Sequence, residues 1–145
     1  IVNAESYKLQ VSRLNEADGP VFKIKNDPRY TRVGKILSRL ALDELPQLMN
    51  IIEGEMVFVG PRPLPLSEAA RVPKKYTLRF SVLPGMTSSW IIEGAHELSF
   101  KRWMELDCEY VKRRTVAHDA IILKDTLTMI VKTILRLLFF RRSVE

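Results

Sequence analysis

Cysteine and histidine are scarce in this chain of 145 residues. Cys108 is the only cysteine, which excludes an intrachain disulfide and a cysteine-based metal cluster. A single free thiol is compatible with a reducing compartment. His96 and His118 lie far apart without the spacing of paired zinc ligands, so we interpret both as ordinary surface or partly buried residues. The sequence therefore predicts no zinc centre.

Long apolar runs are also missing. The best candidate, residues 120–140, is interrupted by charged side chains at Lys124, Asp125, Lys132 and Arg136. A membrane-spanning helix needs about 20 predominantly apolar residues, so no span is predicted, and no signal peptide is recognisable. The chain begins at Ile1 without an initiator methionine, and we expect it to be a piece of a longer protein.

The charge balance is basic. A formal net charge of +6 favours acidic partners, which are nucleic acids, anionic lipids or phosphorylated small molecules. No nucleic-acid-binding motif or aromatic stacking platform is recognisable, so we expect no nucleic-acid partner. With 28% charged and 46% hydrophobic residues, the chain has the composition of one ordered globular domain, residues 1–145.

Hydrophobic periodicity and capping residues predict a compact α+β domain that is mostly helical, with a few short strands. Thr31 is in position to cap a helix over Val33–Leu42, and Asp43 to begin a second helix with Pro46 in its first turn and Gly54 after its end. The other expected elements are a helix within Ala4–Glu16, an edge strand Val21–Lys25, a buried strand Met56–Val59, a helix from Ser67 to Ala70, a basic segment Lys74–Phe80, a loop over Leu83–Thr87, a strand Trp90–Ile92 and a helix from Ser99.

A long C-terminal helix is expected from Thr115 onward. Its apolar stripe comprises Val116, Ala120, Leu123, Leu127, Ile130, Ile134 and Leu138. We interpret the start of this stripe as domain core, and residues 137–142, where apolar side chains meet two arginines, as interfacial. Residues 115–142 thus form an amphipathic region, and the preceding basic cluster Lys112–Arg114 is either a solvated surface or a contact for anionic lipid headgroups.

The adjacent carboxylates Asp43 and Glu44 are the first candidates for chemistry. Aspartate is a good N-cap and glutamate suits the positive end of a helix, so capping explains the pair without any activity. The same position would keep Asp43 ionised, and an ionised aspartate is a competent nucleophile toward phosphorus. Glu44 could then serve as a base or a metal ligand. The two interpretations are compatible with each other.

Arg62 lies between Pro61 and Pro63. The two prolines stiffen the backbone on both sides, so this guanidinium is presented from a rigid turn, and its planar fork suits phosphate oxygens. An ordinary surface arginine is the alternative. Asp107 lies in an expected helix, where its spacing favours a solvent-facing position.

Four motifs occur in one order along the chain and resemble the bacterial sugar transferase family, the monotopic phosphoglycosyl transferases. They are Asn15–Ile24, Asp27–Gly34, Leu42–Leu48 and Val59–Pro63, and further similar positions are Pro84–Thr87, Trp90, Glu97–Ser99, Leu106, Asp107 and Tyr110. The resemblance covers nearly the whole chain. It is far more specific than a single short motif.

The resemblance implies that a sugar 1-phosphate moves from a UDP-sugar to undecaprenyl phosphate, the initiating step of exopolysaccharide, capsule or O-antigen synthesis. It assigns Asp43 as the nucleophile that forms a covalent phosphosugar intermediate and Glu44 as its acidic partner, with Mg²⁺ bound by the pair. It assigns Arg62 to the diphosphate and Asp107 as another functional acid. Arg29, Arg32 and Arg39 complete the expected phosphate-binding set.

The resemblance also implies a membrane-associated catalytic domain on the cytoplasmic face of the bacterial inner membrane, truncated before an N-terminal anchor and expected to be weak or inactive without it. Four positions depart from the family pattern: Ser38, Leu83, Ser88 and Ile91. Ser38 stands where the family places an arginine. These departures motivate an alternative, a non-catalytic relative that acts as a scaffold in polysaccharide assembly.

Overall fold

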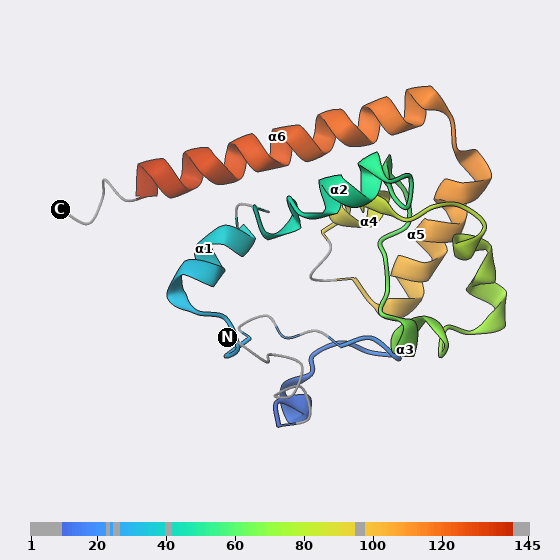
Figure 1. Cartoon of the computed structure of the whole chain (residues 1–145), viewed down its shortest axis with the longest axis horizontal. Coiled ribbons are helices and arrows are strands. Elements are labelled where there is room, and N and C mark those ends of the chain that lie inside the picture. Colours follow the sequence, from blue (N-terminus) through green and yellow to red (C-terminus); the bar gives the residue numbers. More distant parts are fainter. Residues whose placement is uncertain (1–9, 23, 25–26, 40–41, 95–97, 141–145) are drawn as a thin grey trace.

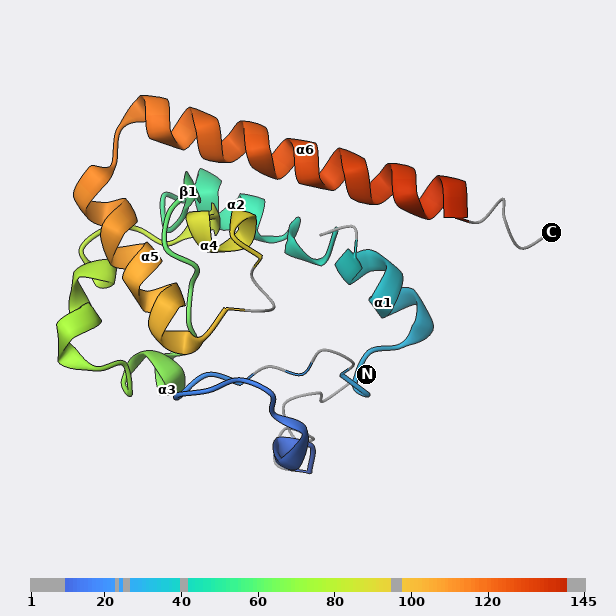
Figure 2. The ribbon, with the colours of Figure 1, turned by 180° about the vertical axis from the view of Figure 1, so that it is seen from behind.

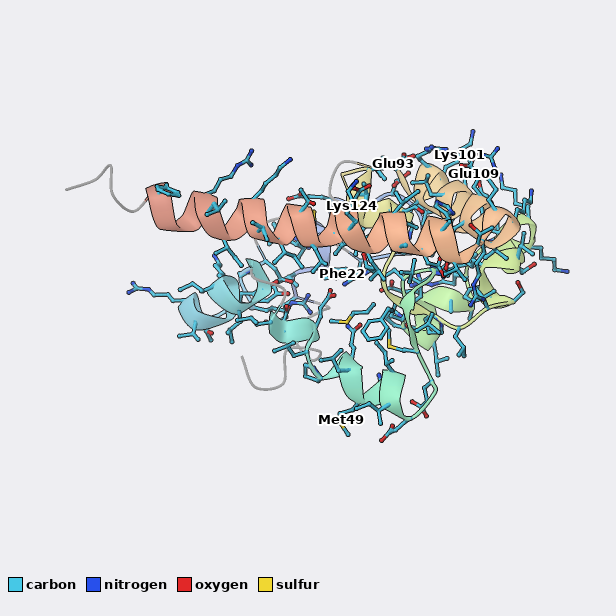
Figure 3. All side chains as sticks on the ribbon, turned by 90° about the horizontal axis from the view of Figure 1, so that it is seen from above. Phe22, Met49, Glu93, Lys101, Glu109 and Lys124 are labelled. Carbon is cyan, nitrogen blue, oxygen red and sulfur yellow. The ribbon has the colours of Figure 1, made fainter. Side chains whose placement is uncertain are left out.

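A computed structural model describes residues 10–22, 24, 27–39, 42–94 and 98–140. Helix α6 (Val116–Phe140) runs along one side of the molecule, with α4 (Ser89–Ile92) beneath it (Figures 1 and 2). Helix α2 (Gln47–Ile52) lies off to one side of α6 when the molecule is seen from above (Figure 3). Helix α5 (Phe100–Arg113) descends at a steep angle to α3 (Leu66–Ala69) at the opposite side. Among the described residues, no helix is long and apolar enough to cross a membrane.

Two short strands form a parallel pair in the middle of the domain. Strand β1 (Val57–Val59) lies against β2 (Gly85–Thr87), with Val57 opposite Gly85 and Val59 opposite Thr87. The sequence predicted β1, but Phe58 is 54% exposed, so the strand is buried on one face only. The sequence assigned residues 83–87 to a loop and missed β2, because a strand of three residues containing a glycine carries almost no periodic signal.

The main core forms around α5. Met104 is fully buried and Trp103 stacks on Trp90 of α4, with ring centroids 4.7 Å apart. The prediction of a strand over Trp90–Ile92 is therefore wrong. These residues belong to helix α4, which brings the Trp90 ring onto Trp103. A four-residue helix and a short strand cannot be separated by an apolar run of this length.

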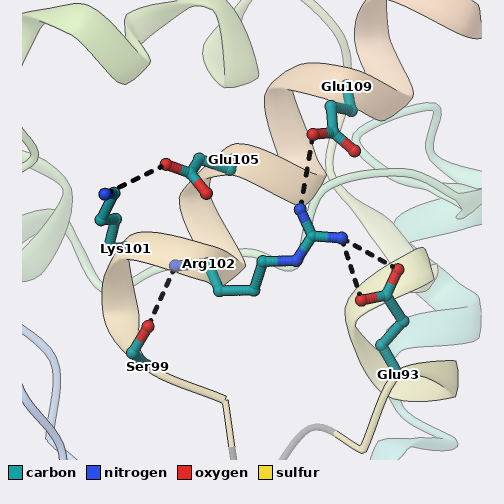
Figure 4. A network of polar contacts seen from close by, with 6 residues as sticks. All are labelled: Glu93, Ser99, Lys101, Arg102, Glu105 and Glu109. Atoms are coloured by element: carbon teal, nitrogen blue, oxygen red, sulfur yellow. Dashed lines mark hydrogen bonds and ion pairs between the residues drawn. The ribbon is translucent and has the colours of Figure 1, made fainter.

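Helix α5 begins where the sequence predicted a helix, directly after Ser99, and its N-terminus is capped. Ser99 accepts a hydrogen bond from the Arg102 amide (3.2 Å), and Asp18 accepts one from the Phe100 amide (2.6 Å). On its exposed face, Arg102 reaches Glu93 and Glu109 while Lys101 pairs with Glu105 (Figure 4). Thr31 likewise caps α1 (Arg32–Arg39) through the Gly34 amide (3.0 Å), and Gly54 follows α2 with φ of +78°.

Helix α6 is attached to the body near its first turns. Ile122 is buried with Val59 and Tyr110, and the Tyr110 hydroxyl bonds the Val59 carbonyl (2.9 Å) and the Asp119 carboxylate (2.8 Å). The predicted core stripe is wrong at its start, since Val116 is 87% exposed and Ile122 makes the buried contact instead. Leu123, a later residue of the stripe, packs against this cluster and is partly buried.

Three other expectations differ from the structure. Val21, Phe22 and Ile24 form no strand, and β1–β2 is the sheet that the described residues make. The α3 helix begins after Pro65, without a side-chain cap from Ser67. The expected N-terminal helix has only the 3₁₀ turn Ser12–Leu14 among described residues, and residues 1–9 lie outside them.

The predicted helix start at Asp43 is also wrong. Leu42–Glu44 form a 3₁₀ turn, and α2 begins only at Gln47, with Pro46 in the N-cap position and no side-chain cap. Because Pro46 has no N–H, a helical hydrogen bond from residue 46 to residue 42 cannot form, and the chain turns separately before α2. Helix α2 lies at the surface, where Met49 points away from the body (Figure 3).

Candidate active site

A cavity of about 660 Å³ brings together segments that are far apart in the chain. The polar part of its lining comes from the Asp43–Glu44 turn, Arg62 and, on α1, Ser38. The apolar part comes from Phe58 of β1, Met86 of β2 and one side of α6, where Leu123, Leu127, Met129 and Ile130 lie. The cavity thus combines charged groups with an extended apolar wall. We call it the main cavity.

Glu44 and Arg62 are paired inside the main cavity. The Arg62 Nη1 donates to the Glu44 Oε1 at 3.0 Å, and the guanidinium lies 5.5 Å from the centroid of the Trp90 ring. Both side chains are partly exposed, so the pair itself contributes at most about 1 kcal/mol to stability. A guanidinium has five N–H donors, and the bond to Glu44 uses one of them. Asp43 is exposed and lines the same cavity.

The backbone around Arg62 is fixed by close contact between two glycines. A Cβ on Gly85 would lie 2.0 Å from the Gly60 nitrogen. Strand β2 can therefore approach this turn only because residue 85 has no side chain. The Gly60 amide donates to the Thr87 carbonyl (3.0 Å) and the Gly85 amide to the Pro61 carbonyl (3.0 Å). These contacts fix the backbone of the turn after β1, and therefore the position from which the Arg62 side chain extends.

Asp107 lies behind this turn and does not line the main cavity. It is 2% exposed and pairs with Arg79, which is equally buried, through bonds of 2.9 and 2.8 Å. The Arg79 Nη2 also donates to the Arg62 carbonyl at 2.6 Å. Burial raises the pKa of Asp107 to about 6, although the charge of Arg79 opposes this shift. The structure therefore connects Asp107 to Arg62 only through Arg79.

The other arginines predicted to bind phosphate lie in different surroundings. Arg29 forms a bidentate pair with Asp27, with a closest contact of 2.6 Å, and lies outside the main cavity. Arg32 is exposed in the first turn of α1. The side chain of Arg39 lies outside the described residues. Ser38 and Ile91, two of the departures from the family pattern, both line the main cavity.

The carboxylate pair was tested as a cation site. Among the described residues, no group of three or more histidine, cysteine, aspartate or glutamate side chains could hold a metal ion. Mg²⁺, however, usually takes one or two carboxylates and completes its coordination with substrate phosphates and water. Asp43 and Glu44 on one cavity wall fit that pattern, so the residues are compatible with a Mg²⁺ ion that a diphosphate substrate helps to bind.

Several lining residues were not singled out from the sequence. Thr87 and Thr126 bond each other at 2.7 Å and tie β2 to α6 at the cavity wall. The exposed central residue of β1, Phe58, could have been found from strand alternation. No local signal indicates that α6 lines the same cavity as Asp43 and Glu44, because this arrangement depends on the tertiary fold.

The sequence is similar to known proteins over most of its length. The bacterial sugar transferase profile matches residues 3–133. The chain belongs to the bacterial sugar transferase family. It is 40% identical over 111 residues to the UDP-galactose-lipid carrier transferase of Erwinia amylovora, which covers 77% of this chain and 23% of that protein.

Two further relatives give the same result. The undecaprenyl-phosphate galactose phosphotransferase of Salmonella typhimurium is 38% identical over 77% of this chain and 23% of its own length. The exopolysaccharide production protein ExoY of Rhizobium meliloti is 40% identical over 72% of this chain and 46% of its own length. The matched region of this family member thus spans less than half of each of these relatives.

Proposed function

We propose that the protein is a phosphoglycosyl transferase that moves a sugar 1-phosphate from a UDP-sugar to undecaprenyl phosphate, at the start of exopolysaccharide synthesis. The observation that carries the proposal is that Asp43, Glu44 and Arg62 line one cavity that also has an extended apolar surface on α6. A phosphate group and a polyprenyl chain need these two surroundings side by side. The names of the relatives from Salmonella typhimurium and Erwinia amylovora support the same substrate class.

The proposed reaction has two displacements at one phosphorus. An Asp43 carboxylate oxygen attacks the β-phosphorus of the donor, and the bond to the bridging oxygen breaks, so that UMP leaves. A phosphate oxygen of the acceptor then attacks the same phosphorus, and the bond to Asp43 breaks, which gives undecaprenyl diphosphate sugar. Arg62 binds the phosphate oxygens, and Glu44 orients Arg62 through their 3.0 Å contact.

Mg²⁺, if held by Asp43 and Glu44, would neutralise the charge that two phosphates bring close to two carboxylates. Asp107 does not touch this cavity. In this proposal it acts through Arg79, which bonds the Arg62 carbonyl, and it therefore positions a binding group.

The location proposed for the protein is the cytoplasmic face of the bacterial inner membrane. Helix α6 exposes Leu127, Val131, Leu135 and Phe139 at four-residue intervals, so they share one side of the helix. Lys132 and Arg136 follow Val131 and Leu135 directly and lie beside that row. An exposed apolar row with flanking cations suits the boundary between acyl chains and anionic headgroups.

A non-catalytic scaffold is the second candidate, and a specific observation favours it: Ser38 and Ile91, which depart from the family pattern, line the main cavity. The deciding experiment incubates the full-length protein with Mg²⁺ and UDP-galactose or UDP-glucose. Intact mass should show a phosphosugar adduct, and UMP should be released.

The Asp43→Asn variant is the matched control for this experiment. It keeps the shape of the side chain and removes the nucleophile, so adduct and UMP should both disappear. A wild-type protein that forms no adduct with any nucleotide sugar, while still binding partner proteins of the pathway, would favour the scaffold.

A further inference from the structure

A second cavity, of about 420 Å³, lies on the other side of Arg62. It shares Arg62, Tyr30 and Trp90 with the main cavity and extends from them toward the segment before α1 and toward α3. Its volume is typical of a small-molecule site, for which about 300–1,000 Å³ is usual. We call it the side cavity. The phosphate-binding residue of the proposed reaction thus separates two spaces of different character.

The lining of the side cavity combines carboxylates with aromatic rings. Asp27 and Glu68 line it and are 7% and 5% exposed, and Phe22, Tyr30 and Trp90 contribute aromatic surface. Arg29 lines it as well and donates to both carboxylate oxygens of Asp27, each of which can accept a further hydrogen bond. The hydrogen bonds from Arg29 hold the pKa of Asp27 below its usual range, so this carboxylate stays charged. Ionised carboxylates accept hydrogen bonds from hydroxyl groups, and aromatic rings provide flat apolar surface. A sugar ring offers hydroxyls at its edge and C–H groups on its faces.

Helix α3, which carries Glu68, is hydrogen-bonded to the segment that precedes Phe22 on the opposite side of the side cavity. Arg71 donates one hydrogen bond to the Ser67 carbonyl within α3 and another to the Pro20 carbonyl, both of 2.9 Å. The second bond joins α3 to the residues that precede Phe22. The side cavity is therefore a built feature between two connected segments, and its width is fixed at this end.

The stereochemistry of the proposed reaction separates the sugar from the other substrate groups. In two successive in-line displacements, the leaving UMP oxygen and the entering acceptor oxygen occupy the same position, opposite Asp43. The nucleotide and the acceptor must therefore use one region in turn, and the sugar needs another region that stays occupied throughout. The main cavity, with its apolar wall on α6, fits the first requirement.

We propose that the side cavity binds the glycosyl group of the donor and selects which sugar is transferred, with Asp27 and Glu68 accepting hydrogen bonds from its hydroxyls. This inference rests on the proposed function. The sugar would remain in the side cavity while UMP leaves and the acceptor enters, and Arg62 would hold the phosphate at the boundary between the two cavities.

The test compares ligands that differ only by the sugar. Dissociation constants for UDP, UDP-glucose and UDP-galactose are measured on full-length protein carrying Asp43→Asn, which prevents turnover. Adding Glu68→Gln should weaken the better-bound UDP-sugar about five- to tenfold, because a weaker bond to a neutral amide oxygen replaces a bond to a charged acceptor, and leave UDP within about twofold. Asp27→Asn, on the other segment, should give the same selective loss. Glu53→Gln, an exposed position after α2, is the matched control and should change neither value.

Two results would overturn the inference. Equal weakening of UDP and UDP-sugar would assign the side cavity to the nucleoside, and unchanged affinity in both folded variants would remove it from the site. If a variant does not fold, hydrogen exchange on the Asp43→Asn protein decides: residues 63–69 should be protected more by UDP-sugar than by UDP. Adduct formation by wild-type protein, followed separately, reports on the proposed function and not on the side cavity.

Discussion

The buried guanidinium of Arg79 donates a 2.6 Å hydrogen bond to the backbone carbonyl of Arg62. Asp107 in turn accepts two bonds from Arg79, and both members of this ion pair are 2% exposed. The position of the partly exposed Arg62 is therefore set from inside the domain. A short series of contacts leads from α5 to the turn that carries Arg62.

Removing Arg79 should destabilise the protein strongly. Arg79→Leu leaves the Asp107 carboxylate buried without its ionic partner, which costs about 3–5 kcal/mol in the free energy of unfolding. Urea denaturation measures this change. Arg102→Leu is the control, because Arg102 makes its ion pairs on the exposed face of α5 (Figure 4) and should lose little. Comparable losses in the two variants would contradict this account of the ion pair.

The contribution of Asp107 to stability should depend on pH. Its pKa is raised from 3.8 to about 6, so the native state holds this proton to higher pH than the unfolded state. The stabilisation from this group is therefore complete below about pH 3.8 and is lost as the pH rises through about 6. The difference in unfolding free energy between wild type and Asp107→Asn should be more favourable to wild type at pH 4.5 than at pH 7. A difference that grows with pH would show that the pKa is lowered instead.

Arg62→Lys should impair the first displacement while keeping the positive charge. Lysine cannot form the planar fork that pairs with Glu44 and binds phosphate oxygens, so the rate of UMP release should fall at least about tenfold. Rapid quench of the first turnover measures this rate. Arg102→Lys, an exposed arginine that lines neither cavity and pairs with Glu93 and Glu109, is the matched control and should stay near wild type. An unchanged rate in Arg62→Lys would remove Arg62 from the diphosphate site.

Ser38→Arg should increase the affinity of the main cavity for UDP. Ser38 lines this cavity, so an arginine there would bring a second cation to the diphosphate. We expect several-fold tighter binding that weakens between 0.05 and 0.5 M salt, values chosen to shorten the Debye length from about 14 to 4 Å. Titration calorimetry at both salt concentrations tests this. Weaker binding would mean that the arginine blocks the cavity.

Charges placed on the exposed row of α6 should reduce lipid binding. Val131→Asp combined with Leu135→Asp puts two carboxylates among apolar residues that are 53% and 46% exposed. Flotation with vesicles containing anionic lipid should show a clear loss for this variant. Leu66→Asp changes a residue that is 89% exposed on α3, at the side of the molecule opposite α6 (Figures 1 and 2), and should leave flotation unchanged. Equal losses would indicate a general effect of added charge.

The sequence predicted what depends on neighbours in the chain. Short patterns predicted the cap at Thr31, the helices after Ser99 and Thr115, the glycine after α2 and strand β1, and the structure confirms them. The family is confirmed as well, because its motifs are long and occur in a fixed order.

The sequence failed where a distant contact decides the local conformation. Trp90 is helical because Trp103 receives its ring, and residues 85–87 form a strand because β1 is there to pair with them. The cavity that contains Asp43, Glu44 and Arg62 has a wall on α6, and the buried pairing of Asp107 with Arg79 joins α5 to a 3₁₀ segment. Hydrophobic periodicity and capping residues in the sequence do not indicate such long-range contacts. The roles of the site residues remain predictions.

The contact between Gly60 and Gly85 makes Arg62 sensitive to a residue that is remote in sequence. A flexible side chain in the way could rotate, but here the obstacle is backbone on both sides, with the Gly60 nitrogen 2.0 Å and its Cα 2.5 Å from a new Cβ on Gly85. A single methyl group at position 85 would therefore push the whole turn, and the arginine with it, away from Glu44. The main core around α5 contains neither glycine, so a substitution of Gly85 would act on the position of Arg62 from a distance of 23 residues in the sequence.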